Sequence, residues 1–176
     1  MQPKHSKYVL WLLFDFPSNE QLKAYIDRFS ERFSTPKFVP HITLGRVPEK
    51  SLKELKQLAA DLSKKFTGFP TSLGSPECGN VAFQRFTAPV ENPFKVIELS
   101  NKFDEICGGE FGKKEDLHVS LLYGEIDCKK LYQFYNSLEF KMPEHLYVQS
   151  IGLVDVSQEV GLWDIKYQAE LKYVSQ

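Results

Sequence analysis

Two short motifs in this chain pair a histidine with a hydroxyl residue two positions later. The first is His41 with Thr43, and the second is His118 with Ser120. Each motif lies in an apolar run rich in residues that favour β-strands, and side chains alternate between the two faces of a strand. Histidine and hydroxyl therefore share one face in both runs. We expect a single site that is built from two halves.

The two imidazoles could act as general base and general acid in one displacement reaction. Histidine titrates near neutral pH, so both of its protonation states are accessible. The hydroxyls of Thr43 and Ser120 would lie at fixed offsets from the rings and could hold the non-bridging oxygens of a phosphate. Either histidine could be the base.

Metal binding and a serine nucleophile are the competing interpretations of these residues. A pair of histidines needs further ligands to hold a metal ion, and neither motif has a carboxylate beside its histidine; Asp116 precedes His118 by two residues, at the edge of a loop. Ser120 lacks the Gly-x-Ser-x-Gly turn that exposes a serine nucleophile. The pattern favours acid–base chemistry without a metal ion, with the hydroxyls as oxyanion ligands.

One such motif alone would be weak evidence, because a lone strand histidine is more often a hydrogen-bonded core residue than a catalyst. Two copies in similar apolar surroundings are stronger evidence. His5 and His145 lack these surroundings, and we interpret them as terminal or surface residues.

Length and composition indicate one globular domain. The chain has 176 residues, of which 42% are hydrophobic and 14% aromatic. Its formal net charge of -1 argues against long nucleic acids and anionic membranes as partners. The first apolar run, Tyr8 to Phe14, has seven residues and is too short for a signal-peptide core or a membrane span. We expect a monomeric cytoplasmic protein with a small-molecule substrate.

The three cysteines, Cys78, Cys107 and Cys128, are odd in number and have no metal-ligand spacing. Without an export signal, we expect a reducing compartment in which all three are free thiols with a packing role.

Hydrophobic periodicity predicts alternating helices and strands. Strands are expected at 8–14, 37–45, 69–73, 78–87 and around 118–122, helices at 19–33, 49–65 and 127–138, a further helix opened by Asn92-Pro93 and closed by Gly108-Gly109, and a C-terminal hairpin at 147–157 and 162–174.

This order contains a weak internal duplication. Trp11, a helix and the His41 strand are mirrored by Phe83, a helix and the His118 strand, with separations of 30 and 35 residues. We therefore expect an α+β fold over residues 1–176, bilobal and duplicated, in which two antiparallel sheets face a central cleft and the helices pack outside.

The paired motifs resemble the signature of the two-histidine phosphoesterase superfamily. More narrowly, the chain is similar to the small cyclic phosphodiesterases of plants and fungi, from about Tyr8 to Trp163. The resemblance rests on residues 38–43 and 118–123, the early Trp11 and the Phe83-Gln84 pair.

The resemblance implies a metal-independent and cofactor-free enzyme that opens ribose cyclic phosphates. Its substrates would be ADP-ribose 1″,2″-cyclic phosphate, opened to the 1″-phosphate, and nucleoside 2′,3′-cyclic phosphates, opened to 2′-phosphates. Plant members are expected to carry further cysteines that pair, but the cysteines here do not fall at those places. The implied roles are His41 and His118 as acid and base, Thr43 and Ser120 as phosphate ligands, Tyr123 near the phosphate, and Trp11 and Phe83 along the cleft beside the nucleoside, although core packing explains these two aromatic residues equally well.

Two alternatives stay open at this point. Another enzyme of the superfamily would act on 2′,5′-linked oligoadenylate or on RNA ends, although the near-neutral charge argues against an RNA processor. A nucleotide-binding module would hold a phosphorylated ligand without turning it over.

Overall fold

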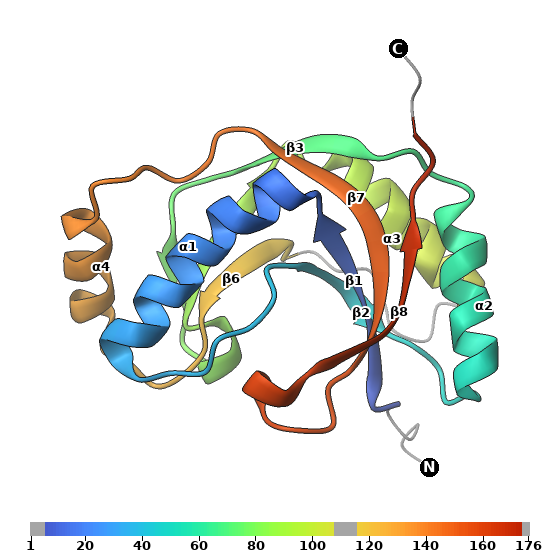
Figure 1. Ribbon diagram of the computed structural model, residues 1–176, viewed down its shortest axis with the longest axis horizontal. Helices are drawn as coiled ribbons and strands as arrows, with labels where there is room; N and C mark the ends of the chain where they lie inside the picture. The colour runs from blue at the N-terminus through green and yellow to red at the C-terminus, as the bar shows by residue number, and fades with distance from the viewer. Residues whose placement is uncertain (1–5, 108–115, 174–176) are drawn as a thin grey trace.

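The computed structural model describes residues 6–107 and 116–173, which form a mixed α/β structure with helices around an antiparallel sheet (Figure 1). The helices in this part of the chain are α1 (Phe16–Phe33), α2 (Leu52–Ser63), α3 (Phe94–Ile106) and α4 (Cys128–Ser137), with short 3-10 turns η1 (Ala82–Gln84) and η2 (Val160–Leu162). The strands are β1 (Tyr8–Phe14), β2 (Ile42–Arg46), β3 (Phe69–Leu73), β4 (Glu77–Cys78), β5 (Phe86–Glu91), β6 (His118–Leu122), β7 (Leu146–Asp155) and β8 (Asp164–Glu170).

All strand pairings are antiparallel, and they connect the strands in the order β1-β2-β6-β5-β3-β7-β8, with β4 beside β5. Because β1 also pairs with β7, six of these strands close a circuit. The predicted α+β class is confirmed. The strands form one sheet and not the two separate sheets that we expected, because β2 pairs with β6 and β3 pairs with both β5 and β7. The duplication into two lobes stays a prediction.

Local capping explains where the helices begin. The carboxylate of Asp15 accepts a hydrogen bond from the Ser18 backbone N–H at 3.0 Å, so α1 begins three residues before the expected Asn19. A reciprocal capping box between Ser51 and Glu54 starts α2. None of the described helices is long and apolar enough to cross a membrane.

Two predicted strands differ from the structure. The strand expected at 37–45 begins only at Ile42, because Pro40 lacks a backbone donor, so His41 lies just before β2. The strand expected at 78–87 is interrupted by η1, so Phe83 lies on a turn between β4 and β5. The closing pair Gly108-Gly109 lies outside the described residues.

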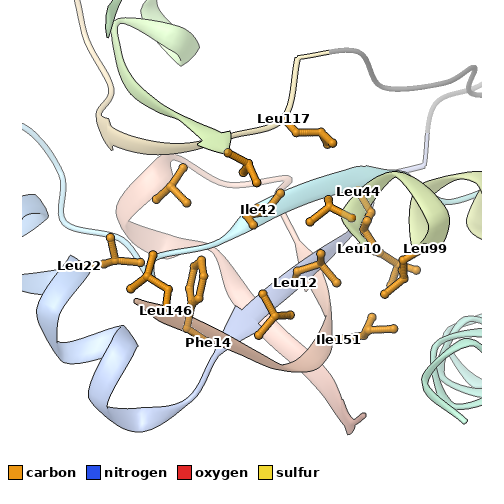
Figure 2. Close-up of a cluster of buried hydrophobic side chains, with 14 of the residues drawn as sticks. Leu10, Leu12, Phe14, Leu22, Ile42, Leu44, Leu99, Leu117, Leu146 and Ile151 are labelled. Atoms are coloured by element: carbon orange, nitrogen blue, oxygen red, sulfur yellow. The ribbon is translucent and has the colours of Figure 1, made fainter. Parts of the chain in front are cut away.

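The main hydrophobic core lies between one face of β1 and the helices that pack on the sheet. Leu10 and Leu12 on this face are fully buried beside Ile42 of β2 (Figure 2). The opposite face of β1 carries Val9 and Trp11, which belong to a second buried cluster with other partners. The strand is therefore buried on both sides, and its second face points toward the candidate site.

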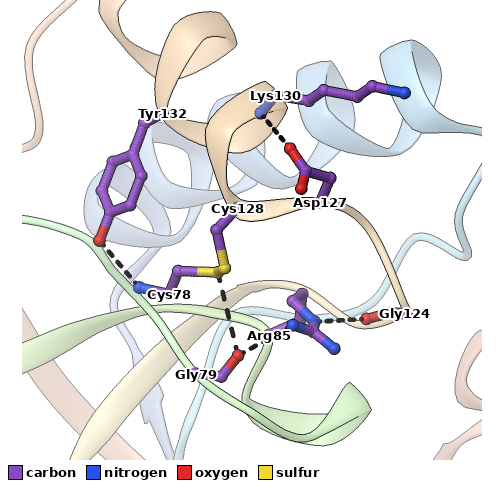
Figure 3. Close-up of a disulfide and its surroundings, with 8 residues drawn as sticks. All are labelled: Cys78, Gly79, Arg85, Gly124, Asp127, Cys128, Lys130 and Tyr132. Carbon is purple, nitrogen blue, oxygen red and sulfur yellow. Dashed lines mark hydrogen bonds between the residues drawn. A yellow bond between two sulfur atoms is a disulfide. The ribbon is translucent and has the colours of Figure 1, made fainter.

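A disulfide between Cys78 and Cys128 corrects the prediction of three free thiols (Figure 3). The two residues are 50 positions apart in the sequence, but their Cα atoms lie 5.8 Å apart, because the fold brings β4 against the first residue of α4. The Cys78 backbone N–H also donates a hydrogen bond to the Tyr132 hydroxyl of α4 at 3.0 Å. Cys107 is buried and takes part in no disulfide among the described residues, as predicted.

Removing this disulfide should destabilise the protein. We expect Cys128→Ser to lower the free energy of unfolding by about 2–4 kcal/mol, because the bond closes a long loop and restricts the unfolded chain. Urea unfolding followed by circular dichroism would measure the loss. Wild-type protein treated with a reductant should match the variant, and the untreated denatured protein should titrate one thiol per chain. Equal unfolding midpoints with and without reductant would contradict the assignment.

Candidate active site

Both histidine motifs contribute side chains to one cavity. Its volume is about 630 Å³, and His41, Thr43, His118 and Tyr123 are among the residues that line it. Ser120 is only 4% exposed and is not among the lining residues, but its side chain forms a hydrogen bond with Tyr123, which is one of them. The motifs, which lie far apart in the sequence, thus meet at one place in the fold.

Strand register explains why they meet. Ile42 of β2 pairs with Val119 of β6 in an antiparallel arrangement. The residues on either side of this pair therefore lie opposite each other and on the same face of the sheet, His41 opposite Ser120 and Thr43 opposite His118.

His41 is held by two contacts in a nearly closed environment. Its ring stacks on Trp11, with centroids 3.6 Å apart and an interplanar angle of 7°. Its Nδ1 lies 2.6 Å from the Val39 carbonyl oxygen. The residue is 4% exposed, so the ring presents only an edge to the cavity.

His118 is held by a backbone contact of the same kind, but its surroundings are more exposed. Its Nδ1 lies 3.1 Å from the Asp116 carbonyl oxygen and 3.3 Å from the Asp116 carboxylate. In both motifs, Nδ1 therefore contacts the carbonyl two residues earlier. A hydrogen bond donated from Nδ1 fixes the tautomer of the neutral ring and places its lone pair on Nε2.

Tyr123 is a neutral hydrogen-bonding group in this site. Burial raises the pKa of its phenol to about 12, while a hydrogen bond with the Ser120 side chain acts in the opposite direction. The phenol therefore keeps its proton throughout the neutral range. It can hold Ser120 in place, but it cannot act there as a base.

The two aromatic residues expected along the cleft have different positions. Trp11 is 3% exposed; it stacks on His41 and also belongs to the lining of the cavity. Phe83 is 63% exposed on η1 and lines the cavity. An open aromatic face of this kind can stack on a nucleobase.

Trp163 is a cavity residue to which our sequence reasoning gave no role. It follows η2 in the connection between β7 and β8, and its ring lies 6.5 Å from Phe83 at an interplanar angle of 18°. It also meets Trp11 edge to face at 5.7 Å. As one of two tryptophans in the chain, it could have been noticed, but nothing in its local sequence connects it with the motifs.

Two charged residues of the cavity were also missed, Arg46 at the end of β2 and Glu159 before η2. Strict alternation along β2 would place Arg46 on the face opposite Thr43, so the sequence pattern did not indicate that Arg46 lines the cavity. Within residues 6–107 and 116–173, no three His, Cys, Asp or Glu side chains are grouped so that they could hold a metal ion.

The chain is similar to known proteins in sequence and in fold. No family model matches the chain. A cyclic phosphodiesterase from Arabidopsis thaliana is 24% identical over 127 residues, which cover 70% of this chain and 68% of that protein.

Solved structures share the whole fold. Escherichia coli LigT in complex with 3′-AMP aligns with a TM-score of 0.61 at 15% identity, covering 96% of this chain and 99% of LigT. TT0787 of Thermus thermophilus aligns with a TM-score of 0.60 at 14% identity, covering 93% and 97%. The sequence match and the shared LigT-like fold confirm the resemblance to the two-histidine phosphoesterase superfamily that the paired motifs predicted.

Proposed function

We propose that this protein is a cyclic phosphodiesterase that hydrolyses ribose cyclic phosphates with its two histidines and without a metal ion. The observation that carries the proposal is the meeting of His41 and His118 at one cavity, each with Nδ1 on a backbone carbonyl. The similar Arabidopsis protein is a cyclic phosphodiesterase, and LigT has been solved with phosphate and with 3′-AMP. Both relatives support a phosphoester as the substrate.

In the proposed reaction, the residues of the site have four roles. One imidazole takes a proton from water, which attacks the phosphorus in line with the ribose oxygen that leaves. The other imidazole gives its proton to that oxygen as the ring opens. Meanwhile, the hydroxyls of Thr43 and Ser120 donate hydrogen bonds to the equatorial oxygens as negative charge develops. Tyr123 holds the Ser120 hydroxyl through their hydrogen bond.

The proposed substrates are small nucleotides. ADP-ribose 1″,2″-cyclic phosphate would yield the 1″-phosphate, and nucleoside 2′,3′-cyclic phosphates would yield 2′-phosphates. The exposed ring of Phe83 at the cavity supports a nucleoside on this side, because an accessible aromatic face favours stacking. Monomeric state and cytoplasmic location belong to the same proposal.

Alanine substitution of either histidine should abolish most of the turnover. We expect His41→Ala and His118→Ala each to lower kcat on adenosine 2′,3′-cyclic phosphate by about a hundredfold to ten-thousandfold, since each removes one proton transfer. Chromatography of the products, with EDTA present, would measure the rate and identify the 2′-phosphate. His145→Ala, which replaces an exposed histidine far from the motifs in the sequence, is the matched control and should retain activity.

The same assay separates the alternatives. Binding of the cyclic nucleotide without any product in the wild-type protein would favour a nucleotide-binding module. Faster cleavage of 2′,5′-linked oligoadenylate or of an RNA end than of the mononucleotide would favour the other enzymes of the superfamily. Loss of activity in EDTA would contradict metal independence.

The pH dependence should separate the histidines from Tyr123. We expect a bell-shaped profile whose two limbs fall in the range where imidazoles titrate. Because the Tyr123 phenol has a pKa of about 12, it stays protonated across that range. Tyr123→Phe should therefore lower kcat/KM but retain both limbs, as measured by initial rates between pH 5 and 9. If the alkaline limb disappears in this variant, Tyr123 and not a histidine is the acid.

A further inference from the structure

A bulge in β2 turns Arg46 toward the cavity. Trp11 of β1 pairs with Thr43, and Val9 pairs with Arg46. A step of two residues along β1 thus corresponds to a step of three residues along β2, because the register shifts between these pairs. Paired residues share a face of the sheet, and Val9 and Trp11 lie on the same face of β1. Arg46 therefore lies on the same face as Thr43, although simple alternation would place it on the other.

The two residues between Thr43 and Arg46 face the core. Leu44 belongs to the main hydrophobic cluster, and a Cβ atom on Gly45 would lie 2.9 Å from the ring of Phe103. Only glycine fits at this close approach without displacing the Phe103 ring. Bulges that re-aim one side chain are common beside functional sites, and here the re-aimed side chain is an arginine.

Arg46 supplies the positive charge of the cavity. Of the described residues that line it, Arg46 is the only one with a permanent positive charge, and Glu159, the one carboxylate, lies on a different element. The guanidinium Nη1 donates a hydrogen bond to the Ser6 carbonyl oxygen at 2.9 Å, which restrains the side chain. A guanidinium carries five N–H donors, so this bond uses one of them.

We infer that Arg46 is a specificity-determining residue that binds a second phosphate on the sugar whose cyclic phosphate is opened. The inference rests on the proposed function and narrows its substrate class. A planar guanidinium with several donors is well suited to a phosphate group and not to an uncharged sugar.

The spacing along the sheet fits this role. The row that contains Thr43 and the row that contains Arg46 are two residue steps apart along β1, which is about 7 Å. The guanidinium of Arg46 is also held at the Ser6 carbonyl oxygen, so we place its phosphate in this second row and not at the histidines. A phosphate on the opposite side of the same ribose, at its 5′ oxygen, is displaced in the required way. The preferred substrates are thus cyclic phosphates that also carry a 5′-phosphate or 5′-pyrophosphate.

The test compares two substrates that differ only in this group, adenosine 2′,3′-cyclic phosphate and its 5′-phosphorylated form. In the wild-type protein, we expect kcat/KM to be about tenfold or more higher for the 5′-phosphorylated substrate, mainly through KM, since a charge-assisted hydrogen bond gives a preference of this size. Arg46→Gln should remove the preference, so that kcat/KM becomes similar for the two substrates. Arg46→Lys should retain part of it, and added salt should weaken it.

Arg32→Gln is the matched control, because Arg32 lies in the last turn of α1 and does not line the cavity. It removes the same charge and should keep the wild-type preference. An Arg46→Gln variant that loses activity equally on both substrates would show a structural role at Ser6, and unchanged kinetics would show no role. Either result overturns the inference and leaves the proposed function intact.

A binding measurement keeps the two proposals separable if no substrate is turned over. Calorimetry with 3′-AMP and adenosine 3′,5′-bisphosphate tests the arginine without any chemistry. Tighter binding of the bisphosphate in the wild type, lost in Arg46→Gln, would support the anion site even though the phosphodiesterase proposal had failed. Equal affinities for the two ligands, or no binding of either, would overturn the anion site as well.

Discussion

The site depends on the pairing of Ile42 with Val119. Both side chains are fully buried in the core, and this burial fixes the register between β2 and β6. A slip of one residue would exchange the two faces of the slipped strand, so its histidine and hydroxyl would enter the core and its apolar residues would line the cavity. The apolar residue in the middle of each motif therefore positions the site as effectively as the polar residues on either side of it.

The features that sequence could predict are those with a local cause. Periodicity gave the type of nearly every element, and alternation placed histidine and hydroxyl on one face of each motif. Two of the features it missed arise from contacts between distant segments. The Cys78–Cys128 disulfide requires β4 to meet α4, and the bulge that turns Arg46 is formed where β2 pairs with β1 while Gly45 packs on Phe103. No spacing rule along the chain encodes either contact.

The two halves of the site are alike in backbone and different in surroundings. Each histidine has Nδ1 on the carbonyl two residues earlier, which fixes the ring in the same way. Beyond that bond, His41 stacks on Trp11 in a buried aromatic setting, whereas His118 lies beside the exposed carboxylate of Asp116. An acid and a base in one reaction need different environments. The different neighbours of His41 and His118 can provide these, although the backbone holds both rings in the same way.

The region around the disulfide also contributes to the site, because it holds the aromatic side of the cavity, Phe83 and Tyr123, in place. Arg85 donates hydrogen bonds to the carbonyls of Gly79 and Gly124 at 3.0 and 3.2 Å (Figure 3). The Gly124 backbone N–H donates to the Ala82 carbonyl at 3.0 Å. Gly124 has a φ of 138°, which favours glycine at this turn directly after Tyr123. These bonds tie η1, which carries Phe83, to the end of the second motif strand. The Cys78–Cys128 disulfide also connects these two parts of the chain, because Cys78 precedes η1 and Cys128 follows β6. The position of Phe83 relative to Tyr123 is therefore set by a covalent bond and by hydrogen bonds together.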